Sequence, residues 1–306
     1  MNNISITEVE KVFVKFYEFK NIEFENLNTL VNDIFAVTTP KGKFALKLYH
    51  TPYRTFEEVQ WETDLLLHLI NHNVPVSKLV VGKSGYINIF QINGQNRVGV
   101  LFEWAHGKKP KPSLSTYTIL GKTAAQIHQA ADTFTSEIKR EQYNAHVLID
   151  EQLLRMKEQL IEADQLERFS QLADRLKKYL NHQVLDKGIC HMDLTLDNIH
   201  RKDDDMTVFD FDSAGECWRA IEPYGVLLTS REYFNAWLDG YRSIRNFNKD
   251  NENAVAAFVI IGEIRNVVWK LGLANSSRGK PLMTSNDLPK VVDEWLSWEE
   301  KNIVYA

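Results

Sequence analysis

One stretch of oxygen-bearing side chains constrains this chain more than any other part of its sequence. Asp193 and Asn198 lie five residues apart, and Asp210 follows on the predicted second strand of a short hairpin. Magnesium takes oxygen ligands in near-octahedral geometry and usually keeps several waters, so a site with few protein ligands suits a magnesium–nucleotide complex. The stretch therefore predicts a metal and phosphate centre around which the rest of the chain is organised.

The composition limits the kind of partner that such a centre can serve. The chain has 306 residues, with 36 basic and 41 acidic side chains and a net charge of −5. This length suits two domains or one unit of two lobes, and it is ample for a buried core. Because no run of Lys and Arg is dense enough to indicate nucleic acid or an anionic membrane as the partner, we expect a small polar or cationic ligand.

The polar start of the sequence and the spacing of its cysteines favour a cytoplasmic location. Residues 1–6 are polar and lack the positive and apolar regions of a signal peptide. The longest apolar run, at 254–262, is too short to span a bilayer. Cys190 and Cys217 have the spacing of neither a zinc site nor a disulfide framework, so a reducing compartment is expected.

The N-terminal part alternates in the manner of β-strands. Residues 33–37 and 43–49 are predicted strands joined by a turn at 40–42, and alternation places Lys47 on the face that looks into a cleft or toward solvent. A solvated strand lysine is the simpler interpretation of Lys47 taken alone. Further strands are predicted within 78–91 around Gly85 and at 97–102.

The helix that follows gives Lys47 a reason to be buried. Thr55 and Glu58 have the spacing of a capping box, which predicts a helix through about residue 71. Glu62 shares the apolar stripe of Val59, and a buried carboxylate is costly unless a cation meets it. Lys47 is the nearest candidate cation in sequence; the alternative is that Glu62 lies at the edge of the stripe in water.

Beyond the turn-rich segment 103–110, helical periodicity dominates. Helices are predicted within 149–181, as a hairpin, and at 231–245, 252–273 and 287–299. The helix at 252–273 is apolar almost all round, yet it carries Glu263, Arg265 and Asn266. Because buried polar groups need partners, these three side chains are expected to line a pocket. His128, a lone helical histidine, is assigned no chemistry.

One pattern is formed by the strand lysine Lys47, the helix carboxylate Glu62 and the loop that carries the oxygen ligands. Phosphoryl transfer needs a lysine on the phosphates, a carboxylate that orients it, metal ligands and a base for the attacking hydroxyl. In this order the residues resemble the protein-kinase-like superfamily. The matching motifs are His191-x-Asp193-x-x-x-x-Asn198 for the catalytic loop, Phe209-Asp210-Phe211-Asp212 for Asp-Phe-Gly, and Phe44-Ala45-Leu46-Lys47 for the strand lysine. Each motif is weak alone, but their order and separation are specific.

Within that superfamily the chain is more similar to the aminoglycoside phosphotransferase and choline kinase-like group, which includes enzymes of the homoserine kinase type. Met192 replaces the arginine of regulated protein kinases, no Ala-Pro-Glu follows Asp210, and no Gly-x-Gly-x-x-Gly precedes Lys47. Segments 120–128 and 210–215 also resemble signatures of this group, and the resemblance covers about residues 26–269.

The resemblance implies an α+β, bilobal, protein-kinase-like fold. A small antiparallel sheet with one key helix would form an N-terminal nucleotide-binding lobe at 1–104. A larger, mainly helical catalytic and substrate-binding lobe would follow at 105–306, with the hinge at about 102–107. The implied activity is ATP-dependent, Mg2+-dependent phosphorylation of a hydroxyl on an amino alcohol, hydroxy amino acid, sugar or aminoglycoside-like antibiotic.

Roles for individual residues also follow from the resemblance. Asp193 would be the catalytic base, and Asn198 and Asp210 would hold Mg2+. Lys47 would contact the nucleotide phosphates, oriented by Glu62.

The adenine and the phosphates would meet backbone as well as side chains. The Glu103 carbonyl and the Ala105 N–H would bind adenine at the hinge. Residues 28–33, among them Asn32, would cover the phosphates in place of a glycine loop.

The acceptor site is assigned to five residues of the second half. They are Asp212, Trp218, Glu222, Glu263 and Arg265. Acidic side chains would bind an aminated acceptor and basic ones would clamp a carboxylate, so the sequence leaves both classes open. The basic candidates are Arg219, Arg242 and Arg265. Glu222 stands where relatives carry an aspartate.

Three alternatives remain at this point. His191, Asp193, Asp210 and Asp212 could bind two metals in a hydrolase, which would leave Lys47 unexplained. A protein Ser/Thr kinase of the same fold would need the same base, although no activation segment is present. A nucleotide-binding regulatory pseudokinase is the third, although every catalytic position is filled.

Overall fold

The computed structural model describes residues 4–27, 29–50, 53–159 and 163–304. Contacts divide the chain into two compact units. The first unit comprises residues 1–109, 133–140 and 198–212, and the second comprises 110–132, 141–197 and 213–306. Sheet and helix both contribute, which confirms the α+β class, whereas the lobe boundary at 102–107 stays a prediction. Within the described ranges, no helix is long and apolar enough to cross a membrane.

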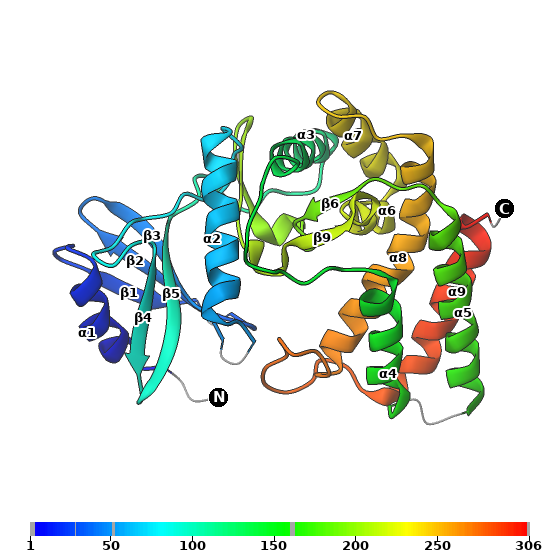
Figure 1. The fold of residues 1–306 in the computed structure, drawn as a ribbon, viewed down its shortest axis with the longest axis horizontal. Coiled ribbons are helices and arrows are strands. Elements are labelled where there is room, and N and C mark those ends of the chain that lie inside the picture. The colour runs from blue at the N-terminus through cyan, green and yellow to red at the C-terminus, as the bar shows by residue number, and fades with distance from the viewer. Residues whose placement is uncertain (1–3, 28, 51–52, 160–162, 305–306) are drawn as a thin grey trace. The chain divides into compact units, whose positions relative to one another are not determined.

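A five-stranded antiparallel sheet forms the frame of the first unit (Figure 1). In the order β1-β2-β3-β5-β4, its strands are β1 (Glu23–Asn26), β2 (Asp33–Thr39), β3 (Gly42–Leu48), β5 (Gln95–Glu103) and β4 (Ile87–Ile92). Alternation sends Phe35 and Leu46 into a core that also receives Phe13 of α1 (Ile6–Phe16). The predicted hairpin at 33–49 is thus confirmed.

One local prediction in this unit is wrong. Within 78–91 only β4 is a strand, because residues 79, 82 and 85 make isolated bridges that do not extend into a ladder.

The helix α2 (Phe56–Asn71) brings Glu62 to the sheet. Thr55 accepts a hydrogen bond from the Glu58 N–H, and the Glu58 side chain accepts one from the Thr55 N–H, so the predicted capping box is confirmed. Glu62 is 1 % exposed, and it therefore lies inside the unit and not at a wet edge. A second hairpin of the same unit, β7 (Ile199–Lys202) and β8 (Asp205–Val208), ends just before Asp210.

The second unit is mainly helical (Figure 1). Its helices are α3 (Leu114–Ala131), α4 (Glu151–Lys157), α5 (Ala163–His182), α6 (Tyr224–Thr229), α7 (Arg231–Arg242), α8 (Lys249–Lys270) and α9 (Leu288–Asn302). Helix α8 is buried almost all round and contacts α4, α6 and α9, as its apolar sequence predicts. The two-stranded pair β6 (Lys187–Cys190) and β9 (Gly215–Trp218) leads into the Asp193 loop.

Helices α3 and α7 approach each other closely at two glycines. A Cβ at Gly121 would lie 2.0 Å from the Trp237 carbonyl oxygen, and one at Gly240 would lie 1.9 Å from the Thr118 carbonyl oxygen. Only a residue without a side chain allows the two backbones to come this near. This contact fixes α3, which carries His128, beside α7.

Candidate active site

A buried lysine joins three carboxylates in the first unit. Lys47 Nζ lies 2.7 Å from Asp210 Oδ1, 3.5 Å from Glu62 Oε1 and 3.8 Å from Asp212 Oδ2. Burial opposes the charged amine, but these carboxylates raise the pKa of Lys47 well above its usual value, so the ammonium stays charged. The predicted contact between Lys47 and Glu62 is confirmed. The burial of Lys47, 4 % exposed, excludes the solvated strand lysine.

Asp212 is held by a second cation and by an amide. Arg54 Nε lies 2.6 Å from Asp212 Oδ1, and Asn32 Nδ2 donates to Asp212 Oδ2 at 2.7 Å. Burial alone would raise the pKa of Asp212, but the charges of Lys47 and Arg54 and these hydrogen bonds lower it to about 2. Asp212 is therefore ionised and engaged by the protein itself.

Arg54 and Arg140 are components of this cluster that the sequence did not indicate. Arg140 Nη2 and Arg54 Nη2 both donate to the backbone carbonyl of Asp212, and Arg140 Nη1 lies 3.7 Å from Glu58 Oε1. The only local signal was the position of Arg54 just before the α2 capping box. Its partner lies 158 positions further along the chain, which no short-range pattern could show.

Asp210 has the features of a metal ligand. The side chain of Asp210 is 43 % exposed, whereas the side chains of Lys47 and Asp212 are buried. Its backbone has φ = +65°, a left-handed conformation that is uncommon outside glycine and that is often found at functional sites. With Glu58 and Arg140 included, four carboxylates face three cations in the Lys47 cluster, and Asn198 is half-buried just before β7. This excess of hard, negative oxygen fits a divalent cation such as Mg2+.

The predicted adenine-binding segment follows strand β5. The Glu103 carbonyl accepts a 3.4 Å hydrogen bond from Ser77 Oγ, and the Ala105 carbonyl accepts one from His200 at 2.8 Å. The Ala105 N–H has no hydrogen-bond partner among the described residues, so it is available as a donor. Asn32 bridges Asp212 and the His50 N–H, whereas Asn28 lies outside the described residues.

In the second unit, Asp193 lies exposed on a strained loop. Its neighbour Met192 has φ = +67°, again left-handed, and the Met192 N–H donates to Glu222 Oε1 at 2.8 Å. The Asp193 N–H donates to His191 Nδ1 at 3.3 Å, and His191 is fully buried. The buried side chains of His191 and Glu222 thus hold the loop on its interior side, while the Asp193 side chain is exposed.

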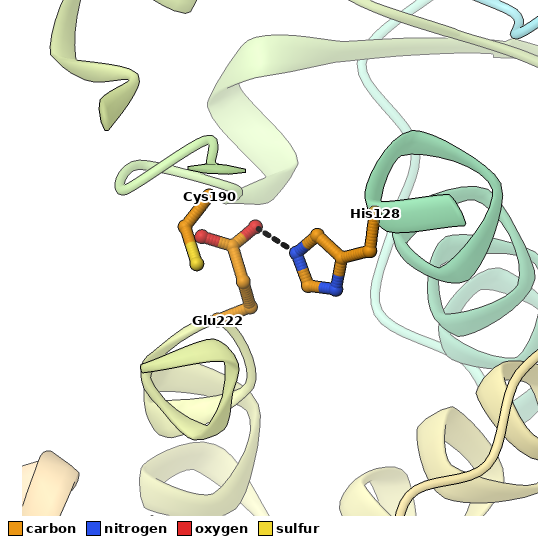
Figure 2. A group of neighbouring side chains, drawn as sticks. All are labelled: His128, Cys190 and Glu222. Carbon is orange, nitrogen blue, oxygen red and sulfur yellow. Dashed lines mark ion pairs between the residues drawn. The ribbon is translucent and has the colours of Figure 1, made fainter. Parts of the chain in front are cut away.

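Glu222 faces His128 and Cys190 in the interior (Figure 2). Glu222 Oε2 lies 3.9 Å from His128 Nε2, and neither atom has a hydrogen-bond partner in the part of the chain that the structure describes. Burial raises the pKa of Glu222 to about 7, against the opposing effect of backbone hydrogen bonds from Met192 and His191. Burial, with the charges of Arg219 and Arg245, lowers the pKa of His128 well below its usual value.

This buried group, His128, Cys190 and Glu222, serves as an anchor for the loop. Its potential ligand atoms lie within 4.8 Å of one another, but Arg219 donates to the His128 carbonyl and brings a positive charge to the same place. Burial also raises the pKa of the Cys190 thiol well above its usual value, which keeps it protonated. Both effects disfavour a cation here.

Other predicted acceptor residues have partners within the second unit. Arg219, 1 % exposed, pairs with Asp132 and Asp186, and Arg242 pairs with Glu252 at 2.7 Å. The Trp218 ring is buried, with Lys187 Nζ 4.5 Å from its centroid.

Glu263 and Arg265 remain half-buried on α8. Asn266 donates to Glu263 Oε1 at 2.9 Å and to the Tyr224 hydroxyl at 3.3 Å, while Arg265 Nη1 donates to the Met192 carbonyl at 3.5 Å. Helix α8 therefore carries the predicted polar residues to the Asp193 loop.

Comparison with known proteins gives a family and a fold. Residues 27–254 match the family described as phosphotransferase enzyme family. An uncharacterized protein of Synechocystis sp. is 29 % identical over 245 residues, which cover 74 % of this chain and 67 % of that protein. Many solved structures share the fold. Amicoumacin kinase hAmiN in complex with AMP-PNP, Ca2+ and Ami has a TM-score of 0.79 and 22 % identity, covering 98 % of this chain and 94 % of that one. A microcompartment-associated aminopropanol kinase has a TM-score of 0.77 and 19 % identity, covering 96 % and 95 %.

Proposed function

Since this chain belongs to the phosphotransferase enzyme family, we propose that it is a small-molecule kinase that transfers the γ-phosphoryl group of ATP to a hydroxyl of its acceptor, with Asp193 as the base. The observation that carries this proposal is the Lys47 cluster: a buried, charged lysine on β3, oriented by Glu62 of α2 and paired with the exposed Asp210. A lysine ammonium in this setting can bind phosphate oxygens. The surrounding carboxylates keep it charged, and its N–H donors can turn from them toward a phosphate.

In the proposed reaction, the exposed Asp193 carboxylate accepts the proton of the acceptor hydroxyl as its oxygen attacks the γ-phosphorus. The new P–O bond forms as the bond from the γ-phosphorus to the β–γ bridging oxygen breaks, and ADP leaves with the electron pair. The left-handed Met192 and its hydrogen bond to Glu222 keep the Asp193 side chain directed outward during this step.

Nucleotide and metal binding are assigned to residues of the first unit. Lys47 would contact the phosphates, and the Glu103 carbonyl and the free Ala105 N–H would meet adenine. Asn198 and Asp210 would hold a divalent ion, proposed to be Mg2+, which neutralises phosphate charge when it is bound. The complex of amicoumacin kinase with AMP-PNP and Ca2+ supports this pairing of a nucleotide with a divalent cation.

The contacts of Asp212 argue against the two-metal hydrolase. A second metal would need its carboxylate, which is already bound by Arg54 and Asn32. The structural neighbours include an amicoumacin kinase and an aminopropanol kinase, and this likeness supports a small acceptor for this chain.

Asp193→Asn tests the proposal. A general base contributes on the order of 10²- to 10⁴-fold, so kcat is expected to fall by about 10³-fold. The Kd for a non-hydrolysable ATP analogue should stay unchanged, because Asp193 is not a nucleotide ligand here. Asp239→Asn, which removes an exposed carboxylate from α7, is the matched control and should keep full activity. Full phosphotransfer by Asp193→Asn would refute the assignment of the base.

A further inference from the structure

Arg265 makes few contacts with the described residues. Its contacts are one long hydrogen bond, from Nη1 to the Met192 carbonyl at 3.5 Å, and the ring of Tyr143, whose centroid lies 5.2 Å from Cζ. No carboxylate among the described residues forms an ion pair with it. A guanidinium carries five N–H donors, so most of the donors of this half-buried side chain make no hydrogen bond to the described residues.

Other arginines of the second unit show what such a side chain normally requires. Arg219 and Arg245 both pair with Asp132 and Asp186, and Arg242 pairs with Glu252. A guanidinium removed from water without a counter-charge costs free energy, so these pairs are expected. Arg265 departs from this pattern, because the charge of Asp193 acts on it but no carboxylate of the described residues forms an ion pair with it.

The neighbours of Arg265 keep it charged. Although burial lowers the pKa of Arg265, the nearby Tyr143 and Tyr224 hydroxyls and Asp193 raise it above its usual value. The Tyr143 ring lies over the guanidinium, with its centroid 5.2 Å from Cζ, and a cation–π contact of this kind does not use up the N–H donors. Two parallel N–H groups match the two oxygens of a carboxylate.

Position links this guanidinium to the reaction. Arg265 bonds to the carbonyl of Met192, the residue that precedes Asp193, so an anion bound at Arg265 lies next to the base. A single guanidinium balances the single charge of a carboxylate. A dianionic phosphate would need a second cation, and none is paired with this position among the residues described.

We propose that Arg265 binds a carboxylate of the acceptor, so that the acceptor is a small hydroxy acid, such as a hydroxy amino acid, and not a simple amino alcohol. This inference rests on the proposed function, because it places the hydroxyl of the same molecule at Asp193. The guanidinium also disfavours a purely cationic acceptor, since like charges would then meet at the site.

Three matched pairs of acceptors test the inference, because the members of each pair differ only by the carboxylate. They are L-serine and ethanolamine, L-threonine and 1-amino-2-propanol, and L-homoserine and 3-amino-1-propanol. The wild-type enzyme is expected to prefer the acid of at least one pair by about 10- to 100-fold in kcat/KM, the range of a charge-assisted contact.

Arg265→Gln should then raise KM for that acid by about 10- to 100-fold, with KM for ATP and the activity on the amino alcohol unchanged. Arg265→Lys should restore part of the loss, since it keeps the charge without the fork. Arg231→Gln, at an exposed arginine of α7, is the control and should match the wild type.

Preference for the amino alcohols, or an Arg265→Gln variant with unchanged KM for the acid, would overturn the inference and leave the proposed function standing. Transfer to no acid of the panel would also overturn it. The proposed function itself fails separately, if Asp193→Asn keeps its activity on whichever acceptor the wild type uses.

Discussion

Replacing Glu222 with glutamine is expected to stabilise the protein at neutral and alkaline pH but not in mild acid. Burial raises the pKa of Glu222 from 4.5 to about 7 in the folded chain. Between these two values the folded state holds a proton that the unfolded chain has lost. The free energy of unfolding therefore falls as pH rises through this range, and the loss is complete above about pH 7.

The magnitude follows from the size of the shift. One pKa unit corresponds to about 1.4 kcal/mol, so the change from 4.5 to about 7 corresponds to about 3 kcal/mol. Glutamine resembles the protonated carboxyl, and its amide oxygen can still accept the Met192 N–H that Glu222 Oε1 accepts at 2.8 Å. The stability of the variant relative to the wild type should thus rise by about 3 kcal/mol from mild acid to about pH 8.

Urea unfolding followed by tryptophan fluorescence measures this difference, since the chain has 7 tryptophans. Both proteins are compared at several values between about pH 5 and about pH 8, with Glu300→Gln, an exposed glutamate of α9, as the control that should show no such trend. A difference that stays constant with pH would refute the reasoning, because Glu222 would then ionise as an exposed glutamate does.

Two further substitutions test the first unit and the helix contact. Lys47→Met removes the cation 2.7 Å from Asp210. It should lower kcat/KM for ATP by about 10²-fold in steady-state kinetics and the free energy of unfolding by about 3 kcal/mol in urea. An unchanged dependence of the rate on ATP would contradict the role assigned to Lys47. Gly121→Ala should destabilise by about 1–3 kcal/mol despite alanine's helix propensity, because its Cβ would meet the Trp237 carbonyl at 2.0 Å. Gly225→Ala is the matched control, because a Cβ at Gly225 would meet no atom within 4 Å outside its own stretch of helix. Equal melting temperatures for the two variants would disprove the close contact at Gly121.

Short-range features of the chain could be predicted from the sequence. The hairpin of β2 and β3 follows from alternation and a turn at 40–42, and the start of α2 follows from the Thr55 and Glu58 capping box. The contact between Lys47 and Glu62 was also accessible, because a carboxylate on an apolar helix stripe requires a cation. These inferences succeed because the interacting groups lie within a few turns or strands of one another.

Sequence reasoning failed where a local pattern had no tertiary support. Residues 78–84 have the composition of a strand, but only isolated bridges form there, since a strand also needs a continuous partner.

Most of the candidate site's electrostatics depended on the tertiary structure alone. The sequence established a carboxylate, an amide and a lysine in the order of a phosphotransferase, and with them the reaction class. It could not show that Arg54 binds Asp212, that Arg219 is committed to Asp132 and Asp186, or that Arg265 forms no ion pair with a described carboxylate. The physical reason is that packing brings side chains together from distant parts of the chain, and these neighbours decide whether a charge is already neutralised. The composition of a motif therefore reveals its chemistry, but not which of its charges remains available to a ligand.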